Sequence, residues 1–272
     1  MKSNTWKDTS KELYDILFKE AEKYTSGKKR IIISPHRILN YLPFQVLSDR
    51  EGNMLVEKFE ISYLPSASIL KYCRDKNPLK KESLLAFEPG DVKIDNLPPL
   101  EGAKKEVKSI AAMFSRKEIL AGKDMRTDTL YKDGKNYDIL HFATHGILDS
   151  SSPLFSSLIF SDRRLPVYEI FDLNLKSYLV CLSACRTGIS EEANGDELVG
   201  LTRAFIYAGT PSICSSLWDV SDVATSELME RFYFYLKDKN KSEALRLAQL
   251  DIMKKYNHPF FWAPFVLTGD WE

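Results

Sequence analysis

Apolar positions recur every three or four residues in several stretches of the chain, a spacing typical of helices that bury one face. The predicted helices cover residues 10–24, 100–114, 198–209, 223–236 and 242–256. In the second of them, Ala103, Val107, Ile110 and Phe114 form one apolar stripe. Gly209 is expected to close the third helix, since glycine readily adopts the left-handed conformation that ends many helices.

Short runs of apolar and β-branched residues between these helices predict buried strands. The predicted strands cover residues 30–34, 57–65, 83–90, 138–143, 157–162, 178–184 and 211–217, with a last one in the C-terminal stretch 258–272. We expect Phe260, Phe261 and Trp262 of that stretch to lie in the core. Strands that alternate with helices indicate an α/β fold with a mostly parallel sheet and helices on both faces.

Composition narrows the possible partners and compartments. No linker rich in proline, glycine or serine divides the chain, so we expect a single domain over residues 1–272; the alternative is a distinct N-terminal lobe over residues 1–80. Lysine plus arginine equal aspartate plus glutamate at 38 each, which argues against a nucleic-acid partner. No apolar run reaches the roughly 20 residues of a membrane helix, and the sequence opens without a signal segment. With only four cysteines, we expect a cytoplasmic protein without a disulfide framework.

Two histidines and two cysteines repeat one spacing. His141 and His145 lie in DILHFATHGIL, and Cys181 and Cys185 lie in LVCLSACRTG, each pair four residues apart. Similar spacings occur in zinc sites. However, residues four apart along a strand are separated by roughly 13 Å, at about 3.3 Å per residue. Because zinc holds its ligands at about 2.0 to 2.3 Å, we expect no metal here.

The four residues instead divide into core and chemical positions. Of these four, His141 and Cys181 are expected in the core, as are the other two cysteines, Cys73 and Cys214. His145 and Cys185 each end an apolar run shortly before a glycine, so we expect them at the carboxyl ends of strands, where chemistry collects in open α/β sheets. A nearby histidine activates a cysteine thiol as a nucleophile. This pattern favours a catalytic pair, with core packing as the alternative, and the N–H groups of Gly146 and Cys185 are suited to hold an oxyanion.

Several longer stretches carry a family resemblance. DILHFATHG, LVCLSACRTG, GDELVGLTRAFIYAGTPSICSSLWDVSDVAT, LMERFYFYL and HPFFWAPFVLTGDW, in this order, resemble the CHAT domain. The CHAT family comprises caspase-like cysteine peptidases related to separase and, more distantly, to caspases, gingipains and clostripain. The resemblance starts near RIIISPHRILNYLPFQVL and continues to the C-terminus. It implies a caspase-like fold that hydrolyses peptide bonds with a histidine–cysteine dyad and no cofactor.

Carried over by position, the dyad is His145 and Cys185, and Gly146 matches the glycine whose N–H helps to hold the oxyanion. Arg186 departs from the acidic residue of typical members; it either alters the surroundings of the nucleophile or faces solvent. The family is often attached to tetratricopeptide repeats, and no repeat region precedes the domain in this chain. Either this is a stand-alone member of the family, or a regulatory part lies upstream or on another chain; we expect an enzyme that is latent until such a partner or repeat region activates it.

The resemblance also suggests what is cleaved. Separase, gingipain and clostripain accept a basic residue before the cleaved bond, so acidic side chains near the site are candidates for a binding pocket. The candidate substrate-binding residues are Asp196, Trp218, Asp219 and Asp222. Alternatively, Asp196 and Asp222 begin helices, and Trp218 is core or pocket wall.

Relatives act in regulated proteolysis, including bacterial defence, so the resemblance implies a specific protein substrate. Two other functions stay open: an inactive caspase-like interaction module, and a hydrolase or acyltransferase that acts on a non-peptide acyl group.

Overall fold

Most of the chain folds around one large sheet. The computed structural model describes residues 5–76, 78, 80–90, 97, 100–149, 151–183, 185–187, 196–218 and 222–272, without the side chains of 101, 185–187, 196–199 and 222. The strands of the large sheet are β1 (Arg30–Ile33), β2 (Glu60–Tyr63), β3 (Ser83–Glu88), β4 (Arg116–Ala121), β5 (Ile139–Phe142), β9 (Leu179–Leu182), β11 (Ser212–Ser216) and β12 (Phe265–Gly269). Within the described residues, these eight strands pair in the order β1-β2-β12-β11-β9-β5-β3-β4. Their pairings are parallel except that of β11 with β12, which confirms the predicted mostly parallel sheet.

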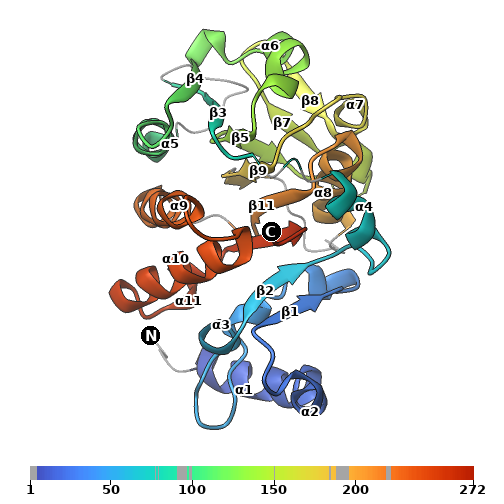
Figure 1. Cartoon of the computed structure of the whole chain (residues 1–272), viewed down its shortest axis with the longest axis vertical. Coiled ribbons are helices and arrows are strands. Elements are labelled where there is room, and N and C mark those ends of the chain that lie inside the picture. Colours follow the sequence, from blue (N-terminus) through green and yellow to red (C-terminus); the bar gives the residue numbers. More distant parts are fainter. Residues whose placement is uncertain are drawn as a thin grey trace.

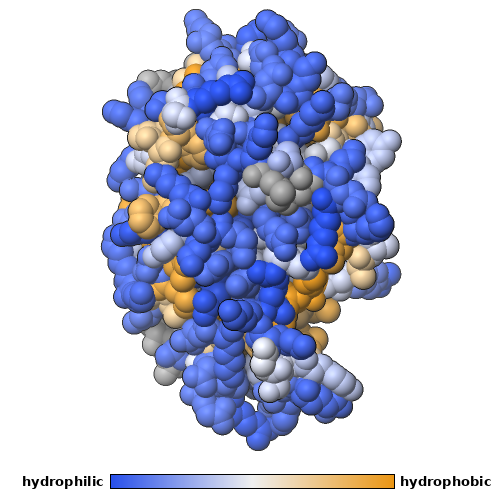
Figure 2. Space-filling view, in the orientation of Figure 1, coloured by the Kyte–Doolittle hydropathy of each residue, from blue (hydrophilic) through white to orange (hydrophobic). Residues whose placement is uncertain are grey.

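Helices cover both faces of this sheet. They are α1 (Thr5–Leu17), α2 (Glu22–Thr25), α3 (Leu55–Lys58), α4 (Ile69–Lys76), α5 (Glu101–Ala111), α6 (Thr127–Asp133), α7 (Val167–Ile170), α8 (Asp196–Ala208), α9 (Asp222–Leu236), α10 (Lys241–Lys255) and α11 (Pro259–Trp262). In Figure 1, α5, α9 and α10 lie on one side of the sheet, and α4 and α8 lie on the other. Figure 2 shows hydrophilic residues over most of the face seen there, because the apolar side chains are enclosed between the layers.

The central strand β3 is buried along its whole length because both of its faces are covered. In β3, Leu84 and Ala86 belong to the hydrophobic cluster under α5, α9 and α10, whereas Leu85 and Phe87 belong to the cluster under α8. All four side chains are fully buried. Such continuous apolar runs are the signal by which these strands could be predicted.

A second, smaller sheet stands beside the first. Its strands are β6 (His145–Ile147), β7 (Ser157–Ile159), β8 (Arg164–Pro166) and β10 (Cys185–Thr187). Within the described residues, they pair in the order β10-β6-β7-β8. Of these four, the sequence pattern predicts only β7, because three-residue strands carry too few apolar positions to form a recognisable run.

The tail differs from its predicted form. Residues Pro259–Trp262 form the single helical turn α11, and only Phe265–Gly269 form a strand. Because consecutive residues of a helical turn point to different sides, the three adjacent aromatic rings do not share one environment. Trp262 is fully buried as expected, but Phe260 is 42% exposed, so its predicted place in the core is wrong.

Gly209 ends α8 as predicted, and its backbone conformation requires a residue without a Cβ atom. Its φ is +117°, and a Cβ atom added there would lie 2.1 Å from the carbonyl oxygen of Leu175. We expect Gly209→Ala to lower the free energy of unfolding by more than the roughly 1 to 3 kcal/mol that backbone strain alone costs. Urea unfolding would measure the change.

Gly52→Ala is the matched control for this prediction. Gly52 also has a positive φ, +92°, but a Cβ atom added there meets nothing within 4 Å. The control therefore carries backbone strain without a steric clash. Equal losses of stability in the two variants would contradict the role assigned to the contact with Leu175.

Candidate active site

The register of the strands brings His145 and Cys185 together. In the large sheet, His141 of β5 pairs with Cys181 of β9. After each of these strands, the backbone leaves the large sheet and starts a strand of the small sheet, β6 at His145 and β10 at Cys185. There the two strands pair in parallel with His145 opposite Cys185. Neighbouring strands lie about 4.8 Å apart, so the backbones of the two predicted catalytic residues are adjacent.

The segment that leads to His145 is held at each residue. Phe142 stacks on Phe87, with ring centroids 4.7 Å apart. The Ala143 N–H donates to the Phe87 carbonyl at 2.9 Å, and the Thr144 hydroxyl donates to the Ile159 carbonyl at 2.7 Å. His145 itself is only 4% exposed. The backbone that leads into His145 is therefore held by the large sheet on one side and by β7 on the other.

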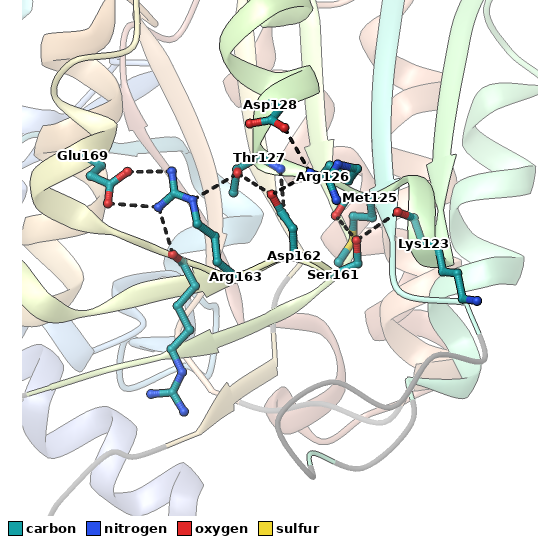
Figure 3. A network of polar contacts seen from close by, with 10 residues as sticks. Lys123, Met125, Arg126, Thr127, Asp128, Ser161, Asp162, Arg163 and Glu169 are labelled. Atoms are coloured by element: carbon teal, nitrogen blue, oxygen red, sulfur yellow. Dashed lines mark hydrogen bonds and ion pairs between the residues drawn. The ribbon is translucent and has the colours of Figure 1, made fainter.

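A polar network joins the small sheet to α6 (Figure 3). The loop between β7 and β8 supplies Asp162, whose carboxylate accepts from the Thr127 N–H at 3.0 Å and from the Thr127 hydroxyl at 2.7 Å. Burial alone raises the pKa of Asp162, but these hydrogen bonds outweigh it and hold the pKa below its usual value. Arg163 donates to both carboxylate oxygens of Glu169 at 2.9 and 2.7 Å. These bonds fix the β7–β8 hairpin against which β6 pairs.

His141 occupies the core, as its sequence context predicts. It is fully buried, and its Nε2 atom lies 3.0 Å from Oε1 of Glu106 in α5. Its Nδ1 atom lies 3.1 Å from the Tyr233 hydroxyl in α9. Burial lowers the pKa of His141, but the adjacent Cys181 and Glu106 raise it by a larger amount. The net result is a pKa of about 10. Cys73, Cys181 and Cys214 are also fully buried, which confirms their predicted core positions.

Glu106 and Tyr233 are polar neighbours of His141 that the sequence patterns did not identify. Glu106 comes three residues after Ala103 and four before Ile110, so it lies within the apolar stripe of its helix. A carboxylate in such a stripe needs a buried partner. That signal points to Glu106, but nothing in the sequence identifies His141 as its partner.

The predicted substrate-binding residues are described only in part. Trp218 is partly buried, packs against both hydrophobic clusters and donates from Nε1 to the Phe260 carbonyl at 3.1 Å, so it lies at the edge of the core. Asp196 and Asp222 are the first residues of α8 and α9, the positions expected of residues that begin helices. Their side chains lie outside the described residues, as do the side chain of Arg186 and all of Asp219. Substrate binding by these residues stays a prediction.

Comparison with known families identifies the fold. The profile of the CHAT domain matches residues 7–270. This chain belongs to the CHAT domain family. Two curated relatives of this CHAT chain are the Tetratricopeptide repeat protein 28 sequences of Mus musculus and Homo sapiens, 37% and 34% identical over 114 residues. The match covers 39% of this chain and only 4% of either relative.

Solved structures agree with the family. The Arg specific cysteine proteinase gingipain R superposes with a TM-score of 0.64 at 14% identity, covering 99% of this chain and 67% of that one. Separase in the Saccharomyces cerevisiae separase-securin complex superposes with a TM-score of 0.56 at 16% identity, covering 84% of this chain and 14% of that one. These likenesses confirm the predicted caspase-like fold of the CHAT chain. In the described part of the chain, no helix is both long and apolar enough to cross a membrane.

Proposed function

We propose that this CHAT domain is a cysteine endopeptidase with His145 as the base and Cys185 as the nucleophile. The observation that carries the proposal is the register of β6 and β10, which sets His145 opposite Cys185. A thiol and an imidazole are the two groups that cysteine peptidases need, and this register brings the backbones of the two residues that carry them side by side.

In the proposed reaction, the imidazole of His145 takes the proton of the Cys185 thiol, and the thiolate attacks the scissile carbonyl carbon. The carbonyl oxygen becomes an oxyanion, which the N–H groups of Gly146 and Cys185 stabilise. When the C–N bond breaks, the imidazolium gives its proton to the leaving amine. Water, deprotonated by His145, then hydrolyses the thioester and frees the thiol.

The proposed enzyme acts on a specific protein and is latent until a partner engages it. The curated relatives that carry a matching segment are tetratricopeptide repeat proteins, and the separase neighbour is in a complex with securin. Both support regulation by a repeat region or by another chain. The gingipain neighbour is Arg specific, which supports a basic residue before the cleaved bond, with Asp196, Asp219 and Asp222 as the acidic candidates.

Active-site labelling tests this proposal directly. The protein would be treated with peptidyl acyloxymethyl ketones that carry arginine, lysine, aspartate, leucine or methionine at the reactive position. Because Cys73, Cys181 and Cys214 are buried, we expect one adduct, on Cys185, measured by intact mass and peptide mapping. The adduct should be absent in His145→Ala. The reactive member of the series would identify the substrate residue.

Iodoacetamide distinguishes a latent enzyme from an inactive one. If no ketone reacts, the alkylation rate of Cys185 would be measured against pH in the wild type and in His145→Ala. A depressed thiol pKa that returns to its ordinary value in His145→Ala supports a formed but latent dyad. An ordinary thiol pKa in both proteins overturns the proposal and favours an interaction module.

A further inference from the structure

Two histidine–cysteine pairs on neighbouring strands follow one another along this fold. His141 pairs with Cys181 in the large sheet, and His145 pairs with Cys185 in the small one, at the same separation along the chain. The link from His141 to His145 has no slack, because the residues within it are stacked or hydrogen-bonded to β3 and β7. A displacement of β5 at His141 must therefore be carried to His145.

His141 contacts helices on one face of the sheet through both ring nitrogens, and its ring also meets the Tyr233 ring edge-on, with ring centroids 5.6 Å apart. Glu106 of α5 and Tyr233 of α9 approach its two ring nitrogens at 3.0 and 3.1 Å. Glu106 is 3% exposed, and Tyr233 is 1% exposed. The surroundings of His141, Glu106 and Tyr233 are otherwise apolar. Ile139, two residues before His141 and on the same face of β5, belongs to the hydrophobic cluster on that side of the sheet.

Stability alone does not account for such a cluster. Replacing a buried ion pair by well-packed apolar residues is often neutral or stabilising, because desolvation of the charges offsets their attraction. The polar contacts of His141 instead specify where β5 lies relative to the helices. A hydrogen bond at Nδ1 and an ion-pair contact at Nε2 define one position for β5 relative to α5 and α9, whereas apolar contacts allow neighbouring positions at similar energy.

We propose that His141, held between Glu106 and Tyr233, is a positioning residue that sets the placement of His145 beside Cys185. It does not touch substrate, and it acts through β5 and the tight link to β6. This inference rests on the proposed function of the dyad. It assigns a task to a histidine that would otherwise be one more core residue.

The test uses His141→Gln, which keeps hydrogen-bonding capacity but not the geometry of the ring, and Tyr233→Phe, which removes one contact from the same cluster. We expect kcat to fall about 10- to 100-fold with KM unchanged, as for small misplacements of catalytic groups. If the wild type is latent, the readout is the pH profile of Cys185 alkylation, and we expect its thiol pKa to return toward the ordinary value in both variants.

Gln45→Met is the matched control. Gln45 is 2% exposed and donates to the Ala263 carbonyl at 2.8 Å, beside β2 and β12 and away from β5. We expect it to lose stability without any change in kcat or in the Cys185 profile. Unchanged reactivity in folded Tyr233→Phe and His141→Gln overturns this inference while the dyad stands. An ordinary wild-type thiol that is insensitive to His145→Ala overturns the proposed function instead. If His141→Gln fails to fold, Tyr233→Phe decides alone.

Discussion

His145→Ala should lower the rate of peptide cleavage by about a thousandfold or more, and Cys185→Ala should abolish it. General acid–base catalysis by a positioned side chain contributes about 10²- to 10⁴-fold, and no reaction proceeds through a thioester without the thiol. Both residues stand at strand starts in the small sheet, outside the strands that form the large one. The melting temperature of each variant should therefore stay near that of the wild type.

The double variant gives the sharper result. Residues that act as one catalytic unit have strongly non-additive effects, so His145→Ala combined with Cys185→Ala should give the same uncatalysed background as Cys185→Ala alone. Cleavage would be followed with a peptide that carries the residue chosen in the ketone series. His36→Ala, which alters an exposed histidine in the loop after β1, is the control and should retain full activity. Substantial cleavage by Cys185→Ala would rule out this mechanism.

The large sheet could be predicted from the sequence because its strands are covered on both faces. β3, β5, β9 and β11 are buried along their whole length, and β3, β5 and β9 are mostly apolar in sequence. β4 could not be predicted in this way, since it lies at the edge of the sheet and most of its residues are exposed. The three-residue strands of the small sheet are formed by pairing between distant segments, which local patterns do not report.

The candidate site shows the same division between local and long-range information. The glycines that follow His145 and Cys185 marked the ends of two apolar runs, and that was enough to single out both residues. The sequence could not reveal that β6 and β10 pair directly, nor that Glu106 and Tyr233 meet at His141. Those contacts join residues of different elements: strand pairing creates the first, and the packing of α5 and α9 on the sheet creates the second.

The buried side chain of Lys241 contributes to stability with a pH dependence opposite to that of His141. Lys241, the first residue of α10, is fully buried, with its Nζ atom 3.9 Å from the centre of the Tyr178 ring. Burial lowers the pKa of Lys241 to about 7, although Asp270 raises it in part. The unfolded chain holds the lysine proton up to its ordinary pKa of 10.5. Between these values the unfolded state binds more protons, so this residue makes stability rise with pH, by about 1.4 kcal/mol per unit.

His141 acts in the opposite direction over the same range. Its pKa is about 10 in the fold and 6.5 in the unfolded chain, so between these values the folded state binds more protons. Its stabilising contribution is complete below pH 6.5 and is lost as the pH rises toward 10. The groups that face it are Glu106, Tyr233, Cys181 and Cys214. Burial raises the pKa values of Tyr233 and Cys181 well above their ordinary values.

We therefore expect the two slopes to be separable by substitution. Urea unfolding between pH 7 and 8.5 should show that Lys241→Met becomes less stable with rising pH relative to the wild type, because His141 is no longer opposed. His141→Gln should become more stable with rising pH relative to the wild type, because Lys241 then acts alone. Each difference should approach about 1.4 kcal/mol per pH unit, and it should vanish when the two substitutions are combined. Parallel pH profiles for the wild type and either single variant would show that the group concerned carries no shifted proton in the fold.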